Sequence, residues 1–359
     1  MEVVQDVTSL LKELNELLAP YTPPRNTWNP ADESLYKPLD LYRVPLEEAK
    51  DMQLKAIKYT FAHHYDNNDF YHKYCEMRNV RPDDLDKIPL IPDTTFKEYL
   101  SGKDFSYWLA TVFTGELPKI VVKSSNPSYD DVINAFNSAG LMVTYSSGTS
   151  GRFTVIPSDL KTFQAAEYAF AKLTGCMTDQ TIHHIHMLSA YHFYLLSSNS
   201  TRTNLFIGKA SNLSLDLLKD GDVQYALDNE ITTESLQMAM RGKRELKTEA
   251  ATISQSEILQ KAVNQIVQWL ERYERTEDTI ALCGPPFMLY YVLVRLQKEG
   301  KHFDFGTRGV VQTGGGWKIQ ENARIPHAEF REQVEDVLGI PDTHCSDSYG
   351  MCEGNGLVV

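Results

Sequence analysis

A run of small and hydroxylated residues near the middle of the chain is the strongest candidate for chemistry. It consists of Ser146, Ser147, Gly148, Thr149, Ser150 and Gly151, and Arg152 follows. Glycines let a backbone curl with its N–H groups turned inward, and small side chains leave room for a bulky anion. The spacing fits neither a Walker loop nor a dinucleotide fingerprint. We therefore predict a phosphate-binding loop of another type, with a flexible surface linker as the alternative.

A second cluster lies where a predicted strand ends. The segment Gly309–Gln312, with Val310 and Val311 at its centre, indicates a strand, and Gly314, Gly315, Gly316 and Trp317 follow it closely. In an open α/β sheet, ligands bind beyond the carboxyl ends of the strands, and glycines there let a flat base or a phosphate approach the backbone. The cluster is therefore a candidate ligand edge, with a tight turn as the alternative.

The third cluster is the polar stretch from Ser346 to Gly354, which follows a predicted helix at 328–338. It offers the aromatic ring of Tyr349, the backbone of Gly350, the thiol of Cys352 and the carboxylate of Glu353. A tight turn is again the alternative. Three such clusters in one order are harder to explain as turns than any of them alone.

In their order and spacing the clusters resemble the signatures of adenylate-forming enzymes, which activate carboxylates with ATP. Residues 147–153 are similar to that superfamily's Ser-Gly-Thr-Thr-Gly-Lys-Pro loop, with Phe153 in place of the proline. Residues 349–353 are similar to its Tyr-Gly-x-Thr-Glu signature, with Cys352 in place of the threonine. The resemblance runs from about residue 50 to the end.

Within that superfamily, the sequence most resembles the LuxE-type acyl-protein synthetases, with phenylacetate–CoA ligases next. Residues 88–97 look like the LuxE-type pattern Ile-Pro-x-x-Pro…Phe-Lys, and residues 315–318 look like its Gly-Gly-Trp-Lys. Residues 68–72 are similar to an Asn-Ser-Pro-Phe-Tyr-Arg element of both groups.

The resemblance implies a role for each candidate residue. The loop Ser146–Gly151 would hold the β- and γ-phosphates of ATP with help from Arg152, and Glu353 would act in catalysis as the ligand of Mg²⁺. Tyr349 would stack on adenine, with Gly350, Cys352 and Gly314–Gly316 completing the nucleotide site. The acyl substrate would contact Tyr191, His192 and Trp317. For His192, a core histidine in an aromatic strand is the alternative.

The spacing of apolar residues predicts an α/β fold with helix-flanked, mostly parallel sheets. Helices are expected over residues 4–18, 46–78, 159–173, 254–275, 287–298 and 330–338. Gly175 is expected to end the third of these helices, and a capping box at Ser254 is expected to begin the fourth. Strands are expected at 279–283 and 309–312. We assign residues 1–100 to a helical amino-terminal segment packed on the main body. Residues 101–359 form the adenylate-forming core, which is expected to lack its carboxy-terminal part.

Composition limits the classes of function. The net charge of −13 opposes nucleic-acid binding, because phosphate backbones demand a basic surface. An acidic amino terminus and the absence of a long apolar run predict neither a signal peptide nor a membrane span. Five scattered cysteines without a Cys-x-x-Cys pair favour reduced thiols in a cytoplasmic protein.

Three functions remain as hypotheses. The first is ATP-dependent activation of a fatty or aromatic carboxylic acid, followed by transfer to a protein thiol, with a protein acyl acceptor or a reductase as partner. The second is an acyl- or aryl-CoA ligase. The third is a non-catalytic binding module that keeps an adenylation-like core.

Overall fold

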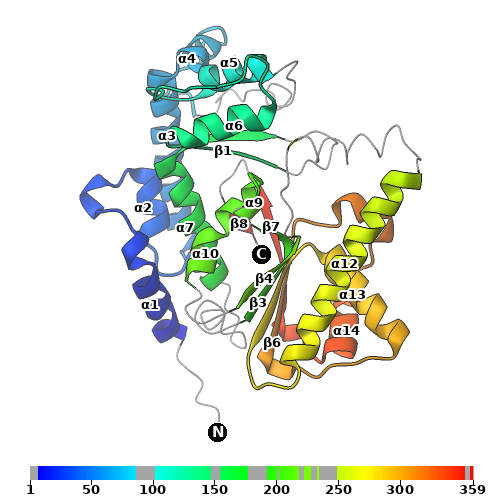
Figure 1. Ribbon diagram of the computed structural model, residues 1–359. Helices are drawn as coiled ribbons and strands as arrows, with labels where there is room; N and C mark the ends of the chain where they lie inside the picture. Colours follow the sequence, from blue (N-terminus) through cyan, green and yellow to red (C-terminus); the bar gives the residue numbers. More distant parts are fainter. Residues whose placement is uncertain are drawn as a thin grey trace.

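A parallel sheet forms the centre of the molecule (Figure 1). The computed structural model describes residues 7–85, 102–146, 154–176, 192–199, 202–217, 222–227, 233, 249–351 and 356–358. The strands are β4 (Val223–Leu227), β3 (His192–Ser198), β5 (Ile280–Gly284), β6 (Gly309–Gly314), β7 (Cys345–Met351) and β8 (Gly356–Val358), in that spatial order. All neighbours pair in parallel except β7 and β8, which are antiparallel. The predicted α/β fold is confirmed.

Three helices cover one face of this sheet: α12 (Glu249–Tyr273), α13 (Pro286–Glu299) and α14 (His327–Leu338). Their apolar sides meet the sheet in the largest cluster of buried side chains, which includes Trp269, Leu289 and Val334. Helix α13 begins with a proline at its first position and ends at Gly300, whose φ of 63° is left-handed. These boundaries agree with the predicted helix at 287–298.

The opposite face carries α7 (Leu160–Cys176), α9 (Phe206–Ala210) and α10 (Asn212–Asp216). Phe193, Ala281 and Val310 point to this side from three adjacent strands and pack against Leu215 of α10. Helix cover on both faces explains why β5 is an almost uninterrupted apolar run.

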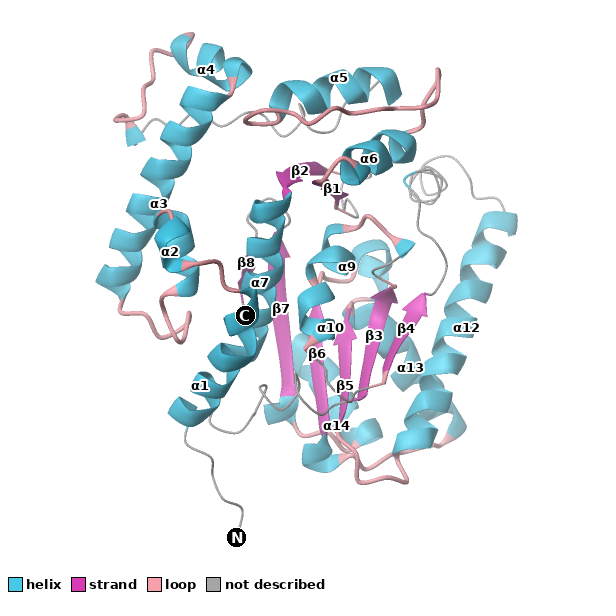
Figure 2. Cartoon of the chain, turned by 60° about the vertical axis from the view of Figure 1, so that its left-hand side comes forward, coloured by secondary structure: helices cyan, strands magenta, loops and turns pink. Residues whose placement is uncertain are grey.

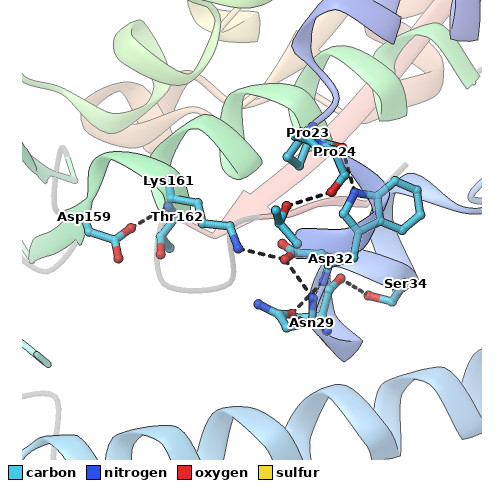
Figure 3. Close-up of polar contacts among 11 residues, drawn as sticks. Pro23, Pro24, Asn29, Asp32, Ser34, Asp159, Lys161 and Thr162 are labelled. Atoms are coloured by element: carbon cyan, nitrogen blue, oxygen red, sulfur yellow. Dashed lines mark hydrogen bonds and ion pairs between the residues drawn. The ribbon is translucent and has the colours of Figure 1, made fainter.

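Four helices form the amino-terminal part of the chain: α1 (Val7–Leu18), α2 (Pro30–Tyr36), α3 (Leu46–Asn67) and α4 (Asp69–Glu76), which agrees with the helices predicted over 4–18 and 46–78. Helices α1 and α2 pack on α7, and α3 packs on α2 and α4. Leu10, Leu14 and Leu18 of α1 are buried in a cluster with α7. Figure 3 shows a polar tie beside it, where Lys161 Nζ of α7 lies 2.9 Å from Asp32 Oδ2, and Asp32 also accepts the Asn29 N–H in the capping box of α2.

Two helices and a hairpin lie beyond the carboxyl ends of the strands (Figure 2). The helices are α5 (Gly102–Val112) and α6 (Tyr129–Ser138), and the hairpin consists of β1 (Leu141–Tyr145) and β2 (Val155–Asp159), paired antiparallel. Short 3₁₀ turns lie at Ala19–Tyr21, Arg25–Thr27, Gly306–Arg308, Lys318–Ala323 and Asp342–His344. No helix in the described part of the chain is long and apolar enough to cross a membrane.

Two predicted helix boundaries were wrong. Gly175 does not close α7, which continues to Cys176. A β-carbon at 175 would meet the methyl groups of Leu14 at 2.6 Å, so glycine is needed there for packing. Ser254 does not cap α12, because the helix already begins at Glu249. The residues Glu249, Ala250 and Ala251 are strong helix formers, and they extend the helix upstream of the expected cap.

Candidate functional site

The strongest candidate site is the carboxyl edge of β6 and β7. Strand β6 ends at Gly314, and Gly315 and Gly316 follow with φ values of 78° and 68°, where other residues are strained. A β-carbon on Gly316 would meet nothing within 4 Å, so it is the conformation that demands glycine there. The chain thus turns away from the sheet and leaves its backbone accessible, as the glycine pattern predicted.

The two strands approach each other closely at this edge. Gly314 pairs with Ser348, and a β-carbon on Gly314 would lie 2.7 Å from Ser348 Oγ. Ser348 Oγ donates to the Thr313 carbonyl at 3.0 Å. Residues 345–351 are therefore a strand paired on both sides, and not the tight turn considered for the polar stretch.

A polar group sits beside the glycines. Thr313 Oγ1 donates to Asp347 Oδ1 at 2.5 Å, and His327 Nδ1 lies 3.8 Å from Asp347 Oδ2. Thr313 is buried, whereas the side chains of Asp347 and His327 are about half exposed. Sequence reasoning missed Asp347, although a carboxylate two residues before Tyr349 was a usable signal.

Tyr349 and Trp317 differ in their surroundings. Tyr349 is 63% exposed at the end of β7, so its ring is available for stacking. Trp317 is only 5% exposed and lies in the core against Tyr290 and Phe330. Gly350 pairs with Leu357 of β8. Of Tyr349 and Trp317, only Tyr349 is therefore accessible to a ligand.

The Ser/Gly loop begins and ends at the neck of the β1–β2 hairpin. Tyr145 pairs with Val155, Ser146 N donates to the Thr154 carbonyl at 2.8 Å, and Thr154 N donates to Ser146 Oγ at 3.0 Å. Asn137 of α6 fixes β1 by accepting the Val143 N–H at 2.6 Å. Residues 147–153, and with them Ser147, Gly148, Thr149, Ser150, Gly151 and Arg152, lie outside the described residues.

The hairpin neck and the glycine edge lie on the same side of the sheet. In Figures 1 and 2 the β1–β2 hairpin stands above the sheet, on the side to which the strands point. Tyr145 is tied to this side by its N–H, which donates to the Asn204 carbonyl at 3.0 Å. The structure therefore brings Ser146 to the side of the sheet that carries Gly314 and Tyr349.

His192 is not part of this group. It begins β3 and is level with Gly309, the first residue of β6, so Gly314 lies five residues, or about 16 Å, further along the strand direction. Its ring stacks on Tyr273 at 4.2 Å, and its Nε2 lies 3.6 Å from Asp278. Tyr191 lies outside the described residues. The structure does not bring His192 to the glycine edge, and its contacts are those of the core-histidine alternative.

Comparison with known proteins gives two relatives across most of the chain. Both are named long-chain-fatty-acid–luciferin-component ligase. The protein from Vibrio harveyi is 24% identical over 315 residues, which are 86% of this chain and 65% of that protein. The protein from Aliivibrio fischeri is 21% identical over 296 residues, 82% of this chain and 60% of that protein. No family model matches the chain.

The chain is similar to LuxE-type ligases. It spans less than two thirds of the length of either relative. The two relatives support the predicted resemblance to the LuxE-type family, and the site residues assigned from that resemblance stay predictions.

Two of the predicted site residues lie outside the described part of the chain. Cys352 and Glu353 lie between β7 and β8 and are not among the described residues. In the described part of the chain, no three His, Cys, Asp or Glu side chains are grouped to hold a metal ion. The assignment of Mg²⁺ to Glu353 therefore stays a prediction.

The four described cysteines, Cys75, Cys176, Cys283 and Cys345, are free and buried. Burial raises the pKa of Cys176 to about 11 and the pKa values of Cys283 and Cys345 to about 12. These three thiols are therefore protonated near neutral pH and poor nucleophiles. None of the four is placed to accept an acyl group.

Proposed function

We propose that this chain is an acid–thiol ligase that activates a long-chain fatty acid with ATP and passes the acyl group to a protein thiol. The names of the two relatives supply the class of acid and point to a protein acceptor. The sequence signatures supply ATP as the activating substrate.

One observation carries the proposal: an exposed aromatic ring stands next to accessible backbone at the carboxyl edge of a parallel sheet. Tyr349 follows Ser348, the register partner of Gly314, so it lies one step beyond the glycine end of β6. A nucleotide base could stack on Tyr349 while its edge meets the backbone of Gly315 and Gly316. The half-exposed Asp347 carboxylate is an acceptor at the same edge.

Activation of a carboxylate with ATP brings two anions together, so catalysis rests on positioning and charge neutralisation. In a protein with a net charge of −13, local hydrogen-bond donors and cations must position and neutralise the two anions. The neck formed by Ser146 and Thr154 holds the two ends of the Ser/Gly loop together, and the loop N–H groups and Arg152 would bind the phosphates. Mg²⁺ held by Glu353 would neutralise charge on the departing pyrophosphate.

Candidates for the acceptor thiol are a cysteine of a second protein and Cys352. The other four cysteines are buried, and a buried thiol cannot meet an activated acyl group at the glycine edge. Acyl transfer to a partner protein is the form of the reaction that the names of the relatives favour.

The test is trapping of the activated acid. The chain is incubated with tetradecanoate, ATP, Mg²⁺ and hydroxylamine, and the hydroxamate and pyrophosphate are measured. We expect equal amounts of both, with no need for coenzyme A. Product that appears only with coenzyme A would favour the CoA-ligase alternative. Nucleotide binding without either product would favour a binding module, and the ligase proposal would then be wrong for this chain.

A further inference from the structure

Strand β1 leads into the Ser/Gly loop, and the edge of β1 that faces away from β2 needs partners outside the hairpin. In an antiparallel pair, residues bonded to the partner strand alternate with residues that turn their N–H and C=O outward. Ser146 bonds to Thr154 across the pair, so Tyr145 and Val143 turn outward. Val143 is opposite Pro157, which has no N–H to donate, and this agrees with the pattern.

Asn137 supplies the partner for Val143. Its Oδ1 accepts the Val143 N–H at 2.6 Å, and its Nδ2 donates to the Val143 carbonyl at 3.3 Å. A side-chain amide carries the same kinds of donor and acceptor as a peptide group, so Asn137 takes the place of a neighbouring strand at this point. Asn137 lies in the last turn of α6, and the chain reaches β1 through Gly140, whose φ of 91° is left-handed.

The same side chain reaches the chain that leaves the main sheet. Tyr145 N donates to the Asn204 carbonyl at 3.0 Å, and Tyr145 and Leu205 form a parallel bridge. Asn137 Nδ2 also lies 3.4 Å from Asn204 Oδ1. Asn204 comes shortly after Ser198, the last residue of β3. Asn137 therefore joins α6, β1 and the segment beyond the carboxyl end of β3.

This junction determines where the start of the Ser/Gly loop lies relative to the sheet. Ser146 directly follows Tyr145, whereas Tyr349 and the glycine edge belong to the main sheet. ATP with its base at Tyr349 and its phosphates at Ser146 would span the junction. AMP has no β- or γ-phosphate, so its affinity would depend mainly on the contacts at the sheet.

We infer that Asn137 is a positioning residue for the β- and γ-phosphates of ATP, because it holds Ser146 at the distance from the glycine edge that the nucleotide spans. The inference rests on the proposed function, which takes ATP as the ligand. The Asn137 amide is bonded to Val143 and Asn204, so it acts through β1 and not by contact with the nucleotide.

The test compares ATP with AMP. Both are titrated by calorimetry into the wild type, Asn137→Ala and Asn137→Asp. The aspartate keeps an acceptor for the Val143 N–H, but it presents an oxygen to the Val143 and Asn204 oxygens in place of the amide donor. A displacement of about 1 Å in a positioned group can cost up to about a hundredfold. We therefore expect both variants to weaken ATP by about tenfold or more and to leave the AMP affinity within about twofold.

Asn264→Ala is the matched control. It removes a side-chain hydrogen bond of another asparagine, which accepts from Arg295 at 3.2 Å, and it should bind both nucleotides like the wild type. Circular dichroism and thermal melting check that the variants are folded, and the aspartate variant decides if the alanine variant does not fold.

A purely structural role of Asn137 would change the melting temperature and affect the two nucleotides alike. The inference is overturned if folded variants bind ATP like the wild type, or if ATP and AMP weaken by the same factor. A wild type that binds neither nucleotide would overturn the proposed function as well. A wild type that binds both, with the same ratio of affinities in the variants, overturns this inference alone.

Discussion

The side chain of Ser348 fills the space that a β-carbon would need at Gly314. An ideal β-carbon at residue 314 would lie 2.7 Å from Ser348 Oγ and 3.1 Å from the Ser348 carbonyl oxygen. The Ser348 hydroxyl is held by its hydrogen bond to the Thr313 carbonyl, so it cannot turn away without losing that bond. Close contact between β6 and β7 thus places Tyr349 beside the glycine edge.

Gly314→Ala should lower the free energy of unfolding by about 1–3 kcal/mol, because overpacking forces the two strands apart. Urea denaturation measures the change. Gly314→Ala combined with Ser348→Ala should recover part of the loss, since the contact at 2.7 Å disappears and the one at 3.1 Å remains. If Gly314→Ala alone is as stable as the wild type, the close approach of Gly314 and Ser348 is contradicted.

Gly175 of α7 is likewise in close contact with a neighbouring element, helix α1, and has no room for a β-carbon. A β-carbon there would lie 2.6 Å from both terminal carbons of Leu14. Gly175→Ala should loosen α1 and speed its cleavage in limited proteolysis, and Leu14→Ala alone should cost about 2–5 kcal/mol. The double variant should be less destabilised than the sum of the two, because the smaller residue 14 makes room for the new methyl group. Strict additivity would show that the two residues do not meet.

Lys172 should make the stability of the fold depend on pH. It is fully buried in α7, its Nζ donates to the Leu35 carbonyl at 2.9 Å, and burial lowers its pKa from 10.5 to about 8. At pH values below 8, the buried charge of Lys172 therefore lowers the free energy of unfolding by on the order of 3 kcal/mol. Between pH 8 and 10.5 the unfolded chain binds more protons at this lysine, so the contribution of Lys172 to stability rises with pH.

The measurement compares the wild type with Lys172→Met, whose side chain has a similar length without the charge. From pH 7 to 10, the unfolding free energy of the wild type should rise relative to that of the variant. Buried groups with raised pKa values, such as Cys176 at about 11 and Tyr36 and Tyr42 at about 12, work in the opposite direction, and the comparison cancels them because both proteins carry them. Parallel pH curves for the two proteins would contradict the assignment.

Replacing Trp317 should change the stability of the fold and not the affinity for the acid substrate. Its ring packs on Tyr290 and Phe330, so Trp317→Ala should cost about 3–5 kcal/mol of unfolding free energy. Trp317→Phe should retain much of the packing and leave the affinity for tetradecanoate unchanged. A folded Trp317→Phe protein with strongly weakened acid binding would restore the role that the sequence suggested.

The sequence predicted elements well where apolar spacing and end signals agree. Helix α13 has Pro286 at its start and Gly300 after its end, and β5 is a continuous apolar run, so both were found close to their true bounds. Strand β7 was not found, because its residues Ser346, Asp347 and Ser348 are polar and its strand conformation comes from pairing with β6 and β8.

The candidate site was also predictable only where local sequence signals define it. Glycines at 314–316 and the ring of Tyr349 follow from local pattern, and the structure brings them to one edge. The position of His192 could not be read locally, because only the register with Ile280 and Gly309 shows that it starts its strand. The burial of Trp317 likewise depends on Tyr290 and Phe330, which are distant in sequence.

Nucleotide binding at Tyr349 tests the central claim most directly. ATP and AMP are titrated by calorimetry into the wild type, Tyr349→Ala and the control Tyr107→Ala, whose ring is equally exposed, 65% against 63%, but lies on α5. Stacking of a base on an aromatic ring contributes about 1–3 kcal/mol, so Tyr349→Ala should weaken both nucleotides by roughly five- to 150-fold. Tyr107→Ala should bind them like the wild type. Absence of binding to the wild type at millimolar nucleotide, or equal affinities in all three proteins, would contradict the account.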